Sequence, residues 1–281
     1  RSWLYEDLEP DDILNNWLNH LSVLEHGSEY ERKVFQFDTS QIEKWGPQGE
    51  VAPMRDLLAD VVMPTYADAD SPPPKAFTTE QWKQAKCAST AYLQQLVTGK
   101  LRPASYTRVV DDMRARDVLE SNSGWPDFAR RNLPDVKSNA IAAAQDGQWK
   151  TYPAIALFRN YNQKTRLVWM FPMSANLVEG SFFQPLQSSL MRREAAFFSP
   201  WIGFDTVRKQ ITKAYQSGKY LYASDFSATD AHFQLATSMQ VCDSIGALYQ
   251  DSAVEQLIES VNNMHTIPLI IGPESKLVGK H

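Results

Sequence analysis

Two aspartates in the segment Tyr222–Phe233 are the residues of this chain best suited to carry chemistry. Asp225 and Asp230 are five residues apart, where a predicted strand over Lys219–Ala223 gives way to a helical pattern that starts at Ala228. A carboxylate at the end of a buried strand is costly without a partner, and a divalent cation is a common partner. The end of a strand also holds the carboxylate rigidly, as a metal site for phosphoryl transfer requires, although the spacing of two acids is not specific by itself. The alternative is structural, with one acid in a loop and the other in the first turn of a helix.

Upstream, the sequence predicts a hairpin that carries two basic residues. An apolar run, Tyr152–Phe158, and the β-rich segment Lys164–Pro172 flank a polar loop. Lys164 and Arg166 are two residues apart, so they share one face of their strand. Arginine offers phosphate oxygens a planar fork and lysine a compact charge, so the pair suits a triphosphate. A solvated hairpin end with ordinary surface charges is the alternative.

A turn of small residues lies further upstream, in Ser121–Pro126 (Ser-Asn-Ser-Gly-Trp-Pro). Such a turn lets a backbone approach a ligand strand closely. A plain surface loop is the alternative for this segment as well.

In this order, the three segments resemble motifs G, F and A of viral RNA-dependent RNA polymerases of the right-hand type. The small-residue turn resembles motif G, the basic strand followed by Pro172 resembles motif F, and Asp225-x4-Asp230 has the form of motif A. The sequence of the basic strand, with Glu179-Gly180 downstream, is most similar to the polymerases of picobirnaviruses and partitiviruses, which are small double-stranded RNA viruses. Of these two groups, the sequence favours the picobirnaviruses.

The resemblance implies a catalytic role for the aspartates. Asp225 would bind the catalytic Mg²⁺ or Mn²⁺ ions, and the carbonyl of Phe226 would add a further ligand. Asp230 would help to select a ribose through its 2′-hydroxyl group.

The resemblance also implies the binding residues. Lys164 and Arg166 would hold the triphosphate of the incoming nucleotide, with Arg159 as a weaker candidate. Ser123 and Gly124 would border the path of the template.

The family also requires motif B and motif C, a Gly-Asp-Asp hairpin with the second metal-binding aspartate, and neither is found in this sequence. The pair Asp111-Asp112 lies among helix formers, which disfavours a displaced motif C there. We expect the chain to be the first part of a longer polymerase, and we expect residues 1–281 alone not to polymerise RNA.

The composition is compatible with part of a large globular protein. The chain has 281 residues, 43% of them hydrophobic, which suffices for one large core or two smaller ones. A net charge of −5 argues mildly against a dedicated nucleic-acid-binding protein, but Arg and Lys concentrate in residues 102–137 and 192–219, as a basic channel requires. Cys87 and Cys242 are far apart and have no metal-ligand spacing, so neither a disulfide nor a zinc site is expected.

The predicted fold class is α+β, a right-hand polymerase with an incomplete catalytic palm. Residues 1–75 would form an N-terminal extension, residues 76–218 the fingers with the turn and the basic hairpin, and residues 219–281 the start of the palm with a returning fingers segment. The patterns further predict helices over 3–24, 53–62, 79–98, 102–119, 204–216 and 254–262, and strands over 34–37, 266–271 and 275–279.

The partners that the resemblance implies are an RNA template, nascent RNA and ribonucleoside triphosphates, with a viral capsid protein as a further candidate and no membrane. The expected location is the virion interior and the host cytoplasm. One alternative function is a non-enzymatic RNA-binding or capsid-associated scaffold. Another is a different magnesium-dependent transferase, for which Glu255–Glu259 would have to supply the second acidic cluster.

Overall fold

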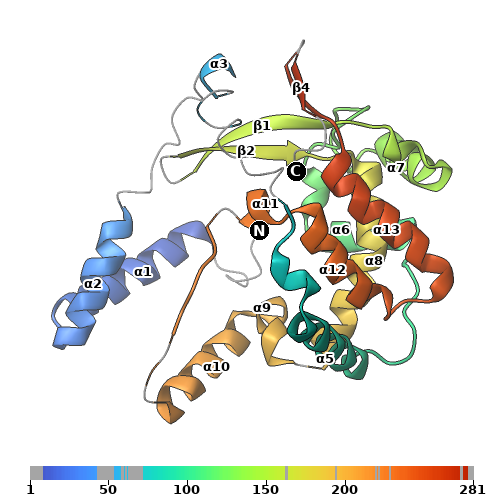
Figure 1. The fold of residues 1–281 in the computed structure, drawn as a ribbon. Coiled ribbons are helices and arrows are strands. Elements are labelled where there is room, and N and C mark those ends of the chain that lie inside the picture. The colour runs from blue at the N-terminus through green and yellow to red at the C-terminus, as the bar shows by residue number, and fades with distance from the viewer. Residues whose placement is uncertain are drawn as a thin grey trace. The chain divides into compact units, whose positions relative to one another are not determined.

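The structure, a computed structural model, describes residues 9–42, 54–57, 60, 62, 72–161, 164–193, 195–218, 220, 222–227, 229–272 and 275–277. The chain divides into two compact units. The first consists of Arg1–Met54 and Phe158–Arg166, and the second of Arg55–Leu157 and Leu167–His281. The second unit holds most of the helices (Figure 1). The domain boundaries predicted at residues 75 and 218 stay predictions.

The first unit contains two helices that pack against each other, α1 (Pro10–Glu25) and α2 (Glu29–Ile42). A capping box starts α2: the amide of Glu31 donates to Ser28 Oγ at 3.3 Å, and the amide of Ser28 donates to Glu31 Oε2 at 2.6 Å. The strand predicted over residues 34–37 is therefore wrong, because this cap commits the following residues to a helix.

The core of the second unit forms around the long helix α8 (Met173–Arg192), which contacts α6 (Tyr106–Ala115), α7 (Pro134–Asp146) and α13 (Asp251–Thr266). Among its fully buried side chains are Trp149, Met173, Leu177, Val109 and Tyr249. Two further helices complete this core, α5 (Glu80–Leu96) and α12 (Leu235–Gly246). Helix α10 (Phe204–Ser217) has 14 residues, none of them buried. The shorter helical elements are α3 (Met54–Leu57), η3 (Lys75–Thr78), η4 (Val118–Glu120), η5 (Gln148–Lys150), η6 (Ala196–Phe198), α9 (Ser199–Ile202) and α11 (Thr229–His232).

Side-chain caps set where the predicted helices begin. The sequence offers Thr78 or Thr79 as the cap of α5, and the cap is Thr79, whose Oγ1 accepts from the amide of Trp82 at 3.2 Å. Ser105 caps α6 in the same way, by accepting from the amide of Arg108 at 3.3 Å. The helix predicted over residues 102–119 therefore starts four residues later than its apolar pattern suggests.

A single sheet has the order β2-β1-β3-β4, formed by β1 (Ala154–Tyr161), β2 (Lys164–Met170), β3 (Leu269–Gly272) and β4 (Ser275–Leu277). Strands β1 and β2 are the predicted hairpin, and β3 and β4 are the two predicted C-terminal strands. β1 and β3 run parallel, with Ala154 opposite Leu269, so residues more than a hundred positions apart meet in one sheet. The mixed helix and sheet content confirms the predicted α+β class.

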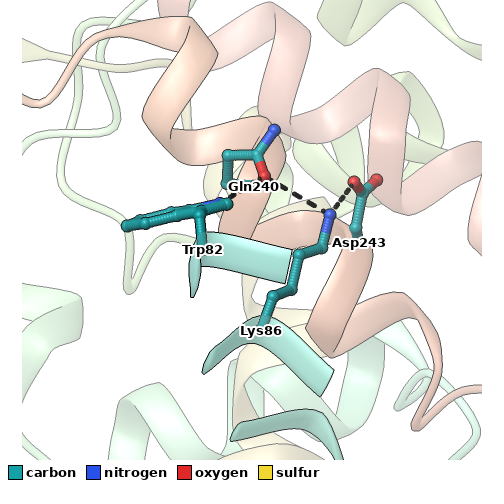
Figure 2. A network of polar contacts seen from close by, with 4 residues as sticks. All are labelled: Trp82, Lys86, Gln240 and Asp243. Atoms are coloured by element: carbon teal, nitrogen blue, oxygen red, sulfur yellow. Dashed lines mark hydrogen bonds and ion pairs between the residues drawn. The ribbon is translucent and has the colours of Figure 1, made fainter. Parts of the chain in front are cut away.

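Polar contacts attach α12 to α5 (Figure 2). The indole Nε1 of Trp82 donates to Gln240 Oε1 at 2.9 Å, and Lys86 Nζ contacts Asp243 Oδ2 at 2.5 Å and Gln240 Oε1 at 3.4 Å. These contacts fix the helix that follows the two aspartates singled out above. Within the described residues, none of the helices has both the length and the apolar character that crossing a membrane requires.

Candidate active site

The loop Ser121–Arg131 is closed by hydrogen bonds within its own backbone. The amide of Ser123 donates to the Ala129 carbonyl at 2.8 Å, and the amide of Arg131 donates to the Ser121 carbonyl at 3.0 Å. The amide of Gly124 donates to Asn122 Oδ1 at 2.8 Å. The segment is therefore an ordered double turn, because most of its polar backbone groups have partners.

The same loop is attached to the start of α8. The Ser123 carbonyl accepts from the amide of Met173 at 2.8 Å, and this amide is one of the helix-terminal donors that have no partner inside the helix. Gly124 has φ +71, and a Cβ atom there would lie 2.9 Å from the Phe171 carbonyl oxygen. Glycine is thus required at this position, but the close approach is to the protein's own backbone.

Ser123 is only 2% exposed, so its side chain faces the protein interior. The exposed aromatic side chains of the loop are instead Trp125 and Phe128, whose rings meet edge to face at 5.8 Å between centroids. Aromatic faces of this kind stack on nucleobases. Neither residue is among the functional residues predicted from the sequence, although Trp125 stands next to Gly124. The template-bordering role of Ser123 and Gly124 stays a prediction.

The basic residues predicted to bind phosphate lie on the hairpin of the first unit. Lys164 and Arg166 are both in β2, two positions apart as the sequence requires, and Arg159 is in β1. The side chains of Arg159 and Arg166 are exposed, and that of Lys164 lies outside the described part of the structure. Thr165 Oγ1 donates to Asn160 Oδ1 at 2.6 Å, which ties the two strands together near their turn.

The segment Tyr222–His232, here called the aspartate segment, differs from the prediction. The strand predicted over residues 219–223 is wrong for the described residues there, which adopt no regular structure. A strand needs a neighbour for its backbone groups, and the described sheet contains no strand from this part of the chain. Asp225 is consequently exposed, and the side chains of Tyr222 and Phe226 are 94% and 81% exposed.

After Asp225 the chain forms two helices instead of the single predicted one. The short helix α11 contains Asp230, whose side chain lies outside the described residues, and α12 begins at Leu235. Thr229 Oγ1 donates to the Phe226 carbonyl at 3.3 Å, which folds the start of α11 back on the aspartate segment. That carbonyl keeps a second lone pair for another partner.

The donor chemistry of this segment fits a hard divalent cation. The carboxylate of Asp225 and the carbonyl of Phe226 are oxygen ligands, which Mg²⁺ and Mn²⁺ prefer, and both residues are exposed. Within the described residues, no group of three or more His, Cys, Asp and Glu side chains is arranged to hold a metal. These donors would therefore supply only part of a coordination sphere.

Asp225, Phe226, Ser123 and Gly124 all belong to the second compact unit, whereas the basic hairpin residues belong to the first. The roles predicted for Asp225, Asp230, Lys164, Arg166 and Arg159 stay predictions.

Comparisons with known proteins point to viral RNA-dependent RNA polymerases. Residues 161–280 match the family described as viral RNA-dependent RNA polymerase. A protein named "Potential RNA-dependent RNA polymerase" from human picobirnavirus (strain Human/Thailand/Hy005102/-) is 23% identical over 252 residues, which are 83% of this chain and 44% of that protein.

Two crystal structures resemble the fold. One is the RNA-dependent RNA polymerase of a human picobirnavirus, with a TM-score of 0.68 and 21% identity, covering 100% of this chain and 54% of that one. The other is its insertion-loop deletion mutant, with a TM-score of 0.66, 21% identity and coverage of 100% and 57%. This chain thus spans about half the length of the relatives that it matches.

Proposed function

Because this chain belongs to the viral RNA-dependent RNA polymerases, on the picobirnavirus side, we propose that the protein takes part in template-directed RNA synthesis from ribonucleoside triphosphates. The observation that supports this proposal best is the order of the three motifs on a matching fold. The family match over residues 161–280 includes the basic strand and the aspartate segment, and the structural likeness extends over the whole chain.

The proposed reaction is a nucleotidyl transfer. The 3′-hydroxyl oxygen of the growing strand forms a bond to the α-phosphorus of the incoming nucleotide, and the bond from that phosphorus to the bridging oxygen of the β-phosphate breaks. Pyrophosphate leaves, and the hydroxyl proton is lost to solvent or a general base. Two divalent ions, when bound, would lower the pKa of the 3′-hydroxyl and offset the charge of the triphosphate.

We assign the residues of this chain to that reaction as follows. The Asp225 carboxylate would hold Mg²⁺ or Mn²⁺, and the Phe226 carbonyl would add an oxygen donor. Asp230 contacts the 2′-hydroxyl and so favours a ribose. A motif C aspartate would have to supply the other carboxylate, so we propose that residues 1–281 alone are inactive.

The basic hairpin binds the negatively charged triphosphate of the incoming nucleotide. Lys164 and Arg166 contact the triphosphate oxygens, where arginine forms paired hydrogen bonds and lysine acts as a point charge, and Arg159 contributes more weakly. Ser123 and Gly124 shape the border of the template path. We place the protein with an RNA template and nascent RNA, in the virion interior and the host cytoplasm, with a capsid protein as a candidate partner.

The test is nucleotide incorporation on a defined single-stranded RNA by a protein that joins this chain to the regions matching the other half of the relatives. We expect labelled nucleotide to enter product only when template and Mg²⁺ or Mn²⁺ are both present. Template-independent incorporation would favour a different nucleotidyl transferase. RNA binding without any incorporation, from a protein that includes the regions matching the other half of the relatives, would overturn the proposal and favour a non-enzymatic scaffold.

A further inference from the structure

A series of partly buried polar side chains connects the loop Ser121–Arg131 to α8, and the proposed function does not use it. Arg131, at the end of the loop, donates from Nε to the Asn122 carbonyl at 3.0 Å and from Nη2 to Asn176 Oδ1 at 3.0 Å. Asn176 lies in the first turn of α8, and its Nδ2 donates to Glu179 Oε2 at 3.3 Å. Both hydrogen bonds are thus donated in the same direction, from Arg131 to Asn176 and from Asn176 to Glu179.

The position of these residues makes them a bridge between two elements. Asn176 and Glu179 are three residues apart on α8, so they lie on the same face of the helix. Arg131 comes from 45 positions earlier in the chain, and its side chain spans the gap between helix and loop. Arg131 is the last residue of the loop, and it also donates to the carbonyl of Asn122 near the start of the loop. Its side chain therefore joins the two ends of the double turn.

The side chains of this bridge lie in a poorly solvated environment. Burial lowers the pKa of the Arg131 guanidinium, and the charge of Glu179 opposes this effect. Burial also raises the pKa of the Glu179 carboxyl to about 7, against the effects of Asn176 and Arg131. Removing one member of such a chain leaves the others without a partner in the interior, which costs more than losing an exposed hydrogen bond.

Elsewhere the loop is held by its own backbone hydrogen bonds and by Asn139 of α7, whose Nδ2 donates to Asp127 Oδ1 at 3.0 Å. The contacts of the loop with the segment before and at the start of α8 are the Ser123–Met173 hydrogen bond and the close approach of Gly124 to Phe171. Both involve the first half of the loop. In the described residues, Arg131 makes the polar link from the second half to α8, because its guanidinium bonds to Asn176.

We propose that Arg131 and Asn176, supported by Glu179, are positioning residues that hold the loop Ser121–Arg131 on α8 in the conformation that receives the template strand. This inference rests on the proposed function for its template. It adds three residues that touch neither nucleotide nor metal. It also explains why a loop with exposed Trp125 and Phe128 keeps a defined shape.

The experiment compares Arg131→Gln with Arg130→Gln in the full chain. Both variants lose one positive charge from neighbouring positions, but Arg130 is exposed and pairs with Glu120 at 3.2 Å outside the bridge. The first readout is amide hydrogen exchange in residues 121–131. The second is the affinity for a fluorescein-labelled single-stranded RNA oligonucleotide, measured by anisotropy. Arg131→Gln should speed exchange in the loop and weaken RNA binding, each by about tenfold, and Arg130→Gln should change each by about threefold at most.

A double variant separates positioning from general stability. Asn176→Asp alone sets two carboxylates side by side and should loosen the loop. Adding Glu179→Gln reverses the direction of the hydrogen bond, because the new amide donates to the new carboxylate, which still accepts from Arg131. We expect Asn176→Asp/Glu179→Gln to recover RNA affinity and loop exchange to within about threefold of the parent chain. This rescue keeps the inference testable if Arg131→Gln fails to fold.

The outcomes are distinct. Faster loop exchange with unchanged RNA affinity would overturn the template role, and unchanged exchange in Arg131→Gln would overturn the bridge itself. Failure of the double variant to recover either quantity would overturn the assigned hydrogen-bond direction. If the parent chain binds no RNA, the template role fails together with the template part of the proposed function, whereas the exchange data still decide whether the bridge exists.

Discussion

The loop Ser121–Arg131 and the aspartate segment are both short and irregular, yet this chain constrains them to different degrees. The loop has paired backbone groups, a buried serine and a partly buried polar bridge to α8. Asp225 and its neighbours are exposed, and the described contacts of the segment are confined to its helical end.

This difference shows how each region gains a defined geometry. The loop is positioned by contacts with α8, the helix at the centre of the core, so its shape is set within the described structure. The aspartate segment resembles a motif that works as a strand, and a strand is positioned by its neighbours in a sheet. Substitutions in the loop should therefore change stability, whereas substitutions at Asp225 should change chemistry alone.

The largest expected effect is on catalysis. In a protein that joins this chain to the regions matching the other half of the relatives, Asp225→Asn should lower nucleotide incorporation by about three orders of magnitude or more, because a neutral amide is a poor ligand for the catalytic ions. The same variant should change the free energy of unfolding by less than about 0.5 kcal/mol, since the side chain is exposed. Incorporation assays and urea denaturation give the two values.

The matched control for that variant is Asp251→Asn, which removes the same charge from an exposed position at the start of α13. It should leave incorporation within about twofold of the parent. Equal losses in the two variants would show that net charge, and not a ligand at Asp225, determines the rate.

The next effect concerns the pH dependence of stability in the loop region. The pKa of Glu179 is raised by burial from 4.5 to about 7, so the folded state binds its proton more tightly than the unfolded state does. The stabilisation is complete below about pH 4.5 and is lost as the pH rises towards 7 and above, by roughly 3 kcal/mol at most. Urea denaturation between pH 4.5 and 8 measures this slope.

Glu179→Gln should flatten the slope and raise the stability at pH 8 above that of the parent. The control is Glu255→Gln at an exposed position of α13, which should keep the parent slope. A parent chain whose stability does not fall over this range would contradict the buried environment of Glu179.

A smaller effect tests the close approach of the loop to Phe171. Gly124→Ala and Gly147→Ala both place a side chain at positive φ, +71 and +87, but only the first brings its Cβ near other atoms. We expect Gly147→Ala to cost about 1 kcal/mol and Gly124→Ala about 2–4 kcal/mol in unfolding free energy. Denaturation curves with similar midpoints for the two variants would argue against the described contact.

The smallest effect concerns α12, the helix that follows the aspartate segment. Asp243→Asn weakens the contact with Lys86, but both side chains are partly exposed, at 28% for Lys86 and 53% for Asp243. The cost should therefore be below about 1 kcal/mol. A thermal unfolding loss well above this value would mean that the attachment of α12 to α5 depends on this pair.

The sequence by itself determined the local features of this protein. The three motifs, the hairpin that holds Lys164 and Arg166, and the cap at Thr79 depend on residues close together in the chain, and their patterns predict them. The capping box at Ser28 is equally local, yet the apolar pattern of residues 34–37 predicts a strand where the structure has a helix.

Only the tertiary structure decided the features that join distant residues. The bridge from Arg131 to Asn176, the bond from Ser123 to Met173 and the pairing of β1 with β3 connect positions 45 or more residues apart. No spacing rule predicts such contacts, because which distant residues meet is decided by the packing of the whole core. For the same reason, the residues around Asp225 carry a strand-like pattern without forming a strand, since a strand requires a partner that local sequence does not provide.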